Sequence, residues 1–402
     1  MKKVVILGGG YGGVAVLREL KDLNNIEVIL IDQNPYQFLQ PEVYNFIANK
    51  YLISDVTIDL FSLCLGIGEK ISFVKAKVMG VDFDRQLVIT EDIEVAYDYL
   101  VFSLGSRTFF PPIKGLRENS SGVKTLMRSM DFKHQFEKKL LTNIKEEGYC
   151  PINKKGRFNI VVGGGGLSGV EIAAEMSAYS QAFFKRAGYL CEGVSITLVE
   201  ATPSILYGMN DFLIDMSYKR LKQLGVDIIT GKRIVEVEKD RVVLDDRTQI
   251  YMDFLIWTGG IIASTLLPKL GLKINKKNQL IVDEFFRVEN FDNVFAVGDC
   301  AEIHDLDTGK ILPPTAQIAM QSGKIVGNHI KSIILNKNLE KKSPKLKGII
   351  AALGGRYGAG VIYDRFKVNG IAGYFLKESV FKSYKYPLKR QAKKGFNKLR
   401  FE

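Results

Sequence analysis

The 402-residue sequence predicts an α/β fold in which two similar βαβ units are followed by a basic C-terminal segment. Three observations predict it: a glycine-rich run that follows a short apolar run near the start, the return of this pattern about 155 residues later, and positive charge concentrated after residue 330. Hydrophobic residues make up 46% of the chain and charged residues 25%, which is typical of a folded protein with two or three domains.

The first unit opens with Lys3–Leu7, a β-branched apolar run of the kind found in buried parallel strands. Gly8, Gly10 and Gly13 follow with the spacing G-x-G-x-x-G, and a helical pattern begins there. The first glycine permits a tight turn, the second lets backbone approach a pyrophosphate, and the third lets helix pack on strand. Asp32 ends the next predicted strand, where a carboxylate binds a ribose hydroxyl.

The second unit repeats this arrangement with Gly164, Gly166 and Gly169, and its acid is Glu200. The distance from the last glycine to this acid is longer than the usual ~20 residues. We therefore expect the helix or the loop after it to be extended over 179–193. A carboxylate accepts a hydrogen bond from a 2′-hydroxyl but repels a 2′-phosphate, so the second unit is predicted to prefer NADH over NADPH.

Two dinucleotide sites in one chain indicate hydride transfer between a nicotinamide and a flavin. The chain resembles the pyridine nucleotide–disulphide reductase superfamily. Gly105, in 104–106, matches its mid-chain glycine turn, and Asp299, at the end of 293–299, matches the aspartate that contacts the ribityl chain of FAD. Members that reduce disulphides have a Cys-x4-Cys pair after the first acid. The chain has no cysteine from Asp32 to Tyr51, so disulphide reduction is disfavoured.

Pro314–Gln321 resembles, more narrowly, the Ala-Gln-x-Ala-x-Gln motif of type II NADH:quinone oxidoreductases. The resemblance implies a helix that begins at Ala316 and faces the flavin, with Gln317 and Gln321 facing the quinone. Without it, two glutamines at i and i+4 are ordinary residues of one helix face.

Three further residues match functional positions of that family. Gly259, in 256–260, lies in the segment beside the nicotinamide, and Glu175 lies on the helix that carries a functional glutamate. Lys377 falls where the family has a lysine near that glutamate, which suggests that the two form a pair for proton delivery. The alternative without a functional role is that Glu171 and Glu175 are solvated acids on one helix face and that Lys377 is one of many surface lysines.

These assignments divide the chain into three parts. Residues 1–115 and 263–330 are predicted to form a discontinuous FAD-binding domain, and 156–262 an NADH-binding domain. Residues 138–157 are polar and basic, which indicates a linker. Residues 331–402 form a C-terminal basic region that is predicted to associate with a membrane.

The charge of this last region is its distinguishing feature. Residues 331–402 contain 18 Lys and Arg against four acids, or +14, whereas the whole chain is +12 and the first 330 residues are therefore about −2. Aromatic and aliphatic residues alternate with lysines over 375–401, a pattern typical of an interfacial membrane segment. Nucleic-acid binding would leave the flavin without a role, and a solvated basic face is the plain alternative. No stretch is apolar enough to span a membrane.

The sequence thus predicts an NADH:quinone oxidoreductase on the cytoplasmic face of the cell membrane, peripheral and not proton-pumping, with a homodimer implied by the resemblance. Sulfide:quinone oxidoreductase is the first alternative, but it needs a redox cysteine late in the chain and none follows Cys300. A soluble NADH-dependent reductase of ferredoxin-like proteins and a redox-sensing binding protein are the others. The four scattered cysteines predict no metal site.

Overall fold

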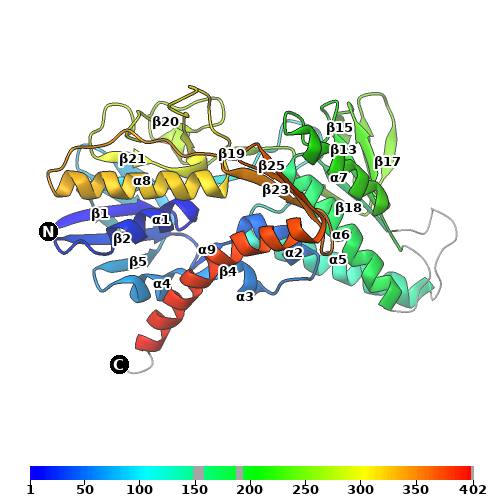
Figure 1. The fold of residues 1–402 in the computed structure, drawn as a ribbon, viewed down its shortest axis with the longest axis horizontal. Coiled ribbons are helices and arrows are strands. Elements are labelled where there is room, and N and C mark those ends of the chain that lie inside the picture. The colour runs from blue at the N-terminus through cyan, green and yellow to red at the C-terminus, as the bar shows by residue number, and fades with distance from the viewer. Residues whose placement is uncertain (148–157, 187–192, 400–402) are drawn as a thin grey trace.

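The computed structural model describes residues 1–147, 158–186 and 193–399, and it places two parallel sheets in two lobes (Figure 1). The first lobe takes its sheet from both early and late parts of the chain. Its strand order is β21-β9-β1-β2-β5, all parallel, with bounds β1 (Lys2–Leu7), β2 (Ile26–Asp32), β5 (Ile71–Lys75), β9 (Tyr99–Phe102) and β21 (Val294–Ala296). Central β1 is fully buried from Val4 to Leu7, as the continuous apolar run predicts.

Helices α1 (Tyr11–Leu20) and α8 (Ala316–Ile334) lie side by side on this sheet (Figure 1). A Cβ at Gly323 of α8 would overlap the carbonyl oxygen of Gly12, and one at Gly327 would crowd that of Val16, so the two backbones are in contact. The later contact of α8 is also the later contact of α1, so the two helices run parallel. Both N-termini therefore lie at the same end, beside the glycine turn.

The second lobe has the same architecture. Its sheet has the order β11-β18-β12-β13-β14, with bounds β11 (Ser121–Gly122), β12 (Phe158–Gly163), β13 (Val194–Glu200), β14 (Asp227–Thr230) and β18 (Phe254–Trp257). Its helices are α5 (Leu126–Glu147), α6 (Leu167–Arg186) and α7 (Asp211–Gln223). The α/β fold with two Rossmann-like domains is thus confirmed.

Helix lengths settle two of the predictions. The helix after the second glycine turn continues to Arg186, which confirms the extension and accounts for the distance between Gly169 and Glu200. The predicted linker over 138–157 is wrong as far as Glu147, because α5 runs through it; the remainder lies outside the described residues.

Small sheets and ribbons join the lobes and cover their edges. The antiparallel sheets are β6 (Val78–Asp82), β7 (Leu87–Thr90) and β8 (Glu94–Ala96), and β15 (Ile234–Val237), β16 (Arg241–Leu244) and β17 (Gln249–Tyr251). Two-stranded pairs are β3 (Tyr36–Phe38) with β4 (Thr57–Asp59), β10 (Ser106–Thr108) with β19 (Ile261–Ala263), and β20 (Leu280–Ile281) with β22 (Ala301–Glu302). Short helices α2 (Val43–Ile47), α3 (Ile53–Val56) and α4 (Leu60–Ile67) lie between β3 and β5.

The C-terminal region is an antiparallel sheet followed by one long helix. The sheet consists of β23 (Gly348–Ala352), β24 (Gly358–Ile362) and β25 (Phe366–Asn369), and the helix is α9 (Gly370–Leu399) with Pro387 inside it. Helix α9 begins between the lobes and ends below the first one (Figure 1). No helix among the described residues is long and apolar enough to cross a membrane.

The prediction that α9 lays an apolar side against lipid needs correction, because one side of the helix is buried in protein. Leu388 is fully buried and Tyr384 packs on the Tyr11 ring. Lys377 and Lys385, which the sequence assigns to the cationic side, are buried as well. Phe375 and Tyr386 remain exposed.

Candidate active site

The first glycine turn has the geometry of a dinucleotide cradle. Gly8 has φ +105°, and a Cβ there would overlap the Ser103 carbonyl oxygen; a Cβ at Gly13 would overlap the carbonyl of Gly8. Nothing lies within 4 Å of a Cβ at Gly10, so the turn is open where backbone meets a pyrophosphate. Asp32 accepts hydrogen bonds from the Gly9 amide at 2.7 Å and the Asn34 amide at 2.8 Å. These hydrogen bonds hold the Asp32 carboxylate against the glycine turn.

The second turn repeats these relations. Gly164 has φ +111°, a Cβ at Gly169 would overlap its carbonyl oxygen, and the position above Gly166 is again open. Glu200 accepts from the Gly165 amide and from both the amide and hydroxyl of Thr202, at 2.7 and 2.8 Å. Residues and geometry at both turns therefore fit a dinucleotide.

The other residues assigned to FAD lie in the first lobe, and Gly105 and Asp299 follow the carboxyl ends of the parallel strands β9 and β21. Asp299 lies just after β21, and the Ser106 hydroxyl donates to it at 2.5 Å. Gly105 has φ +62°, in the left-handed region that favours glycine, and open space surrounds it. Ala316 is the first residue of α8, whose cap is the hydroxyl of Thr315. The free amides of this helix start favour an anion or a partial negative charge.

Gly259 follows the end of β18, the strand that lies next to the second glycine strand in the sheet. A Cβ there would overlap the ring of Trp257, whose indole donates to the Phe109 carbonyl at 2.8 Å. Glycine at 259 therefore lets the chain turn back over the indole at the edge where a nicotinamide would enter.

Gln317 and Gln321 each make a pair of hydrogen bonds to one extended segment. Gln317 donates to the Gly348 carbonyl at 3.0 Å and accepts from the Lys347 amide at 2.9 Å. Gln321 donates to the Lys345 carbonyl at 2.9 Å and accepts from its amide at 3.0 Å. Both side chains thus fasten the start of β23 onto α8. Their contact with a quinone stays a prediction.

Glu171 and Lys377 form a buried ion pair between α6 and α9. The carboxylate also accepts from the Ala352 amide at 3.0 Å, and the ammonium donates to the Ile350 carbonyl at 2.8 Å. Burial raises the pKa of Glu171 above its ordinary value, although Lys377 opposes this. Glu171 is therefore not a solvated acid.

Glu175, one turn further along α6, forms a second pair. Lys50 donates to its two oxygens at 3.0 and 3.1 Å and to the Gly355 carbonyl at 3.1 Å. The Gly355 amide donates back to Glu175 at 3.3 Å. Glu175 is 1% exposed and Lys50 is 29% exposed, so this pair connects a buried carboxylate to the surface. Burial raises the pKa of Glu175, with Lys50 opposing.

The predicted partnership of Glu175 with Lys377 is therefore wrong in its detail. Lys377 binds Glu171, because residues four apart on a helix lie on one face but one turn apart along it. The partner of Glu175 is instead Lys50, which belongs to no motif of the sequence. Lys377 still lowers the pKa of Glu175 through its charge, so the two pairs are electrostatically coupled.

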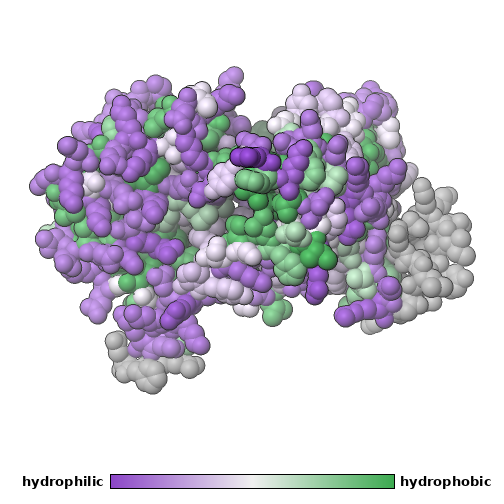
Figure 2. Space-filling model, in the orientation of Figure 1, coloured by the Kyte–Doolittle hydropathy of each residue, from purple (hydrophilic) through white to green (hydrophobic). Residues whose placement is uncertain are grey.

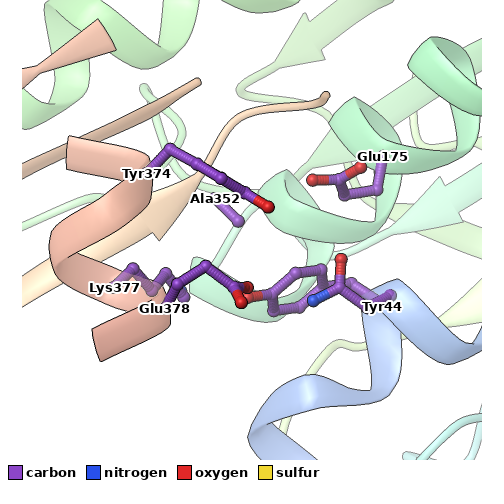
Figure 3. A pocket seen from close by; sticks show the side chains of 7 residues that line it. Tyr44, Glu175, Ala352, Tyr374, Lys377 and Glu378 are labelled. Carbon is purple, nitrogen blue, oxygen red and sulfur yellow. The ribbon is translucent and has the colours of Figure 1, made fainter. Parts of the chain in front are cut away.

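A small cavity lies between the pairs. It has a volume of about 10 Å³, close to the least that holds one water molecule. Figure 3 shows its walls: Glu175 from α6, Tyr374, Lys377 and Glu378 from α9, Tyr44 from α2 and Ala352 from β23. Elements from both lobes and the C-terminal region thus converge on the two carboxylates.

Sequence reasoning missed Lys50, Tyr44 and Tyr374 because they belong to no motif. The one available signal was the spacing of Glu171 and Glu175 among buried apolar residues of α6, since buried carboxylates require cationic partners.

Two cysteines fall within the described residues, and both are inert thiols in apolar surroundings. Burial raises the pKa of Cys64 to about 12 and that of Cys300 to about 11. The remaining two, Cys150 and Cys191, lie outside those residues. Over the same described part of the chain, no cluster of three His, Cys, Asp or Glu side chains has the arrangement of a metal site.

Two glycine turns with their ribose-binding acids, on two parallel sheets, define an enzyme of the two-dinucleotide oxidoreductase class. The chain belongs to the pyridine nucleotide-disulphide oxidoreductase family, whose model matches residues 2–323. It is 26% identical to the type II NADH:quinone oxidoreductase of Staphylococcus saprophyticus over 387 residues, which cover 94% of each chain. A similar relative from Haemophilus influenzae, of the same name, is also 26% identical.

Solved structures share the fold over nearly the whole chain. NDH2 of Plasmodium falciparum, solved with NADH, superposes with a TM-score of 0.85 at 19% identity and covers 100% of this chain. The sulfide:quinone oxidoreductase of Aquifex aeolicus gives 0.80 at 20% identity and covers 97%.

Proposed function

We propose that this protein is an FAD-dependent NADH:quinone oxidoreductase. The observation that carries the proposal is the extent of the similarity to the type II enzymes. The family model ends at residue 323, whereas the match to the Staphylococcus saprophyticus enzyme leaves only about 24 residues of this chain uncovered. The similarity therefore includes the C-terminal sheet and at least the start of α9, which supply Ala352, Tyr374 and Lys377 to the candidate site.

FAD, when bound, takes a hydride from NADH and passes the two electrons on to an acceptor. The turn with Gly8, Gly10 and Gly13 would hold its pyrophosphate, with Asp32 on the ribose and Asp299 toward the ribityl chain. The second turn, with Glu200, would hold NADH and exclude a 2′-phosphate. Gln317 and Gln321, by fixing β23 on α8, would shape the quinone end of the site.

Reduction of a quinone by NADH consumes one proton from solution in addition to the hydride. We assign the delivery of this proton to Glu175. Its buried carboxylate beside a water-sized cavity and its partly exposed partner Lys50 support the assignment. Lys377, held by Glu171, supplies a fixed positive charge on the opposite wall. That charge favours electron arrival on a nearby acceptor.

Stopped-flow kinetics of the two half-reactions test this role. Glu175→Gln is expected to slow reoxidation of the reduced flavin by quinone about a hundredfold, typical of removing a general acid, with little effect on flavin reduction by NADH. Glu289→Gln, which changes an exposed glutamate, is the matched control. Equal slowing of both half-reactions in E175Q would remove Glu175 from proton delivery.

The same experiment tests the function. Bleaching of the flavin by NADH and its recovery with quinone is expected of the unmodified enzyme. Reduction of the flavin by sulfide but not by NADH would favour the sulfide:quinone enzyme. Reoxidation of the reduced flavin by a ferredoxin-like protein but not by quinone would favour the soluble reductase. The buried, protonated Cys64 and Cys300 favour neither of these.

We further propose a peripheral position on the cytoplasmic face of the cell membrane. The net charge of +14 in residues 331–402 supports attraction to anionic lipid, and a membrane-dissolved quinone requires contact with the bilayer. A homodimer stays a prediction, which sedimentation of the FAD-loaded protein tests.

A further inference from the structure

Lys124 is a half-buried cation that joins the two lobes and belongs to no motif of the sequence. Few charged side chains of the described chain are buried, and Figure 2 shows hydrophilic residues over much of both lobes. The side chain of Lys124 is only 19% exposed, and that of its partner Asp299 is 16% exposed. Nζ of Lys124 lies 3.5 Å from Oδ2 of Asp299, across the boundary between the second lobe and the first. Water and salt screen such a pair less than a pair on the surface.

The strand register places Lys124 at the edge of the second sheet where a nicotinamide would enter. Strand β11 runs parallel to β18, with Gly122 opposite Trp257. Two residues further along the two chains come Lys124 and Gly259, so both leave the sheet at the same end. Lys124 therefore lies between the candidate nicotinamide segment and the carboxylate that the ribityl chain of FAD would contact.

The Asp299 carboxylate receives its donors on one of its two oxygens. The Ser106 hydroxyl donates to Oδ2 at 2.5 Å, and the Lys124 ammonium lies beside the same oxygen. The backbone carbonyl of Asp299 accepts from Nε2 of Gln279 at 3.0 Å, which fixes the main chain. Within the described ranges nothing donates to Oδ1, although each oxygen of an ionised carboxylate accepts about two hydrogen bonds. Oδ1 is thus left for a ribityl hydroxyl.

The charge of Lys124 distinguishes two roles for this ion pair. A pair that only ties the lobes together would act on the stability of the fold. A positive charge beside the flavin also stabilises the reduced cofactor, because reduction adds negative charge to its ring system. The reduction potential of the bound flavin therefore separates the two roles.

We propose that Lys124 is a positioning residue of the flavin site. Together with Ser106 it holds Asp299 so that Oδ1 meets the ribityl chain, and it adds a positive charge that favours the reduced flavin. Because Lys124 comes from the second lobe, FAD affinity and flavin potential depend on how the NADH lobe sits against the FAD lobe. The inference rests on the proposed function only in that FAD occupies the first site.

Two measurements on the FAD-loaded protein test this role: dissociation of FAD, followed by flavin fluorescence, and the midpoint potential of the bound flavin, titrated with a chemical reductant against a reference dye. Lys124→Met is expected to weaken binding of oxidised FAD about tenfold, since Asp299 loses a charged partner. Reduced FAD should weaken about tenfold more, which lowers the two-electron potential by about 30 mV. Lys124→Arg keeps the charge and should retain most of the affinity and the potential.

Two further variants complete the experiment. Lys139→Met breaks a more exposed pair of the second lobe, with Asp253 at 3.2 Å, and is the matched control, which should change neither quantity. Ser106→Ala removes the neutral donor to the same Oδ2 and should weaken FAD binding without lowering the potential, so it tests the carboxylate even if K124M folds poorly.

An unchanged potential in K124M would overturn the inference and leave the pair as a tie between the lobes. Equal losses in K124R and K124M would also overturn it, as would normal FAD affinity in both K124M and S106A. Neither measurement uses NADH or quinone. An unmodified protein that binds FAD but passes no electrons from NADH to quinone would instead remove the proposed function.

Discussion

The ion pair of Lys50 and Glu175 predicts a pH-dependent loss of stability when the lysine is replaced. Lys50→Met keeps the length of the side chain and removes three hydrogen bonds, two to the carboxylate and one to the Gly355 carbonyl, all at 3.0–3.1 Å. The 1% exposed carboxylate then retains only the Gly355 amide at 3.3 Å. An ionised group left without its counter-charge in such a place destabilises the fold.

The magnitude follows from this geometry. Breaking a fully buried pair costs about 3–5 kcal/mol. Lys50 is 29% exposed, so water replaces part of its interaction, and we expect a loss of about 2 kcal/mol in the free energy of unfolding.

The loss depends on pH in a defined direction. The folded pKa of Glu175 is already above the unfolded value, so the folded state holds the extra proton between the two values and stability falls as pH rises through that window. Removing Lys50 raises the folded pKa further and widens the window. The variant should therefore lose least at low pH, where Glu175 is protonated in both states.

Urea unfolding of the flavin-loaded protein at about pH 5 and about pH 8 measures this difference. The double variant K50M/E175Q should recover most of the stability at high pH, because no buried charge remains. Additive losses from the two single changes, or a K50M loss independent of pH, would refute the reasoning.

Three substitutions test other contacts. Gly13→Ala should weaken FAD retention about tenfold, because the added Cβ would overlap the Gly8 carbonyl oxygen. Flavin absorbance after gel filtration measures the retained FAD. Normal retention would contradict the close packing of this turn. Glu200→Ala should raise the KM for NADH about tenfold and lower the ratio of kcat/KM for NADH to that for NADPH. Steady-state kinetics with both nucleotides measure this ratio. An unchanged ratio would contradict the role of Glu200. Gly395→Ala should lower the free energy of unfolding by about 2 kcal/mol, because the added Cβ would overlap the Ser62 carbonyl oxygen. Lys394→Ala, at an exposed position, is the control. Equal losses of stability in the two variants would contradict the close contact between α4 and α9.

The parts of the fold that depend on short sequence motifs, such as the two glycine turns and the strands before them, were predictable. A Cβ at Gly8, Gly13, Gly164 or Gly169 would overlap backbone, so these glycines mark their turns wherever they occur. The apolar run before each turn forms a strand buried on both faces. The long helix α5 was not predictable in the same way, because its second half is polar and basic and its stability comes from the buried face of Phe132 and Phe136 at its start.

The site was predictable only in its motif residues. The motifs predicted that Glu175 lies on one helix and that Gln317 and Gln321 lie near the start of another, and the structure has them on α6 and α8. Which lysine reaches which carboxylate depends on how α2 and α9 pack against α6, and no local pattern encodes that. Lys50 comes from a segment without periodicity, and its partner is 125 residues away.

In the basic C-terminal region, residues 331–402, lysines of the same sequence pattern have two different structural roles. Alternating aromatics and lysines over 375–401 resemble an interfacial segment throughout, yet Lys377 and Lys385 are buried in ion pairs with Glu171 and Glu42. Removing either lysine would leave a buried carboxylate in a different lobe unpaired, so these two cations hold α9 across both lobes. Arg390, Lys393 and Lys394, which follow, are exposed and form no ion pair within the described part of the chain. One helix therefore carries Tyr374 and Lys377 of the cavity wall at its start and exposed cations at its end, so the proposed membrane contact and the geometry around Glu175 would be coupled through α9.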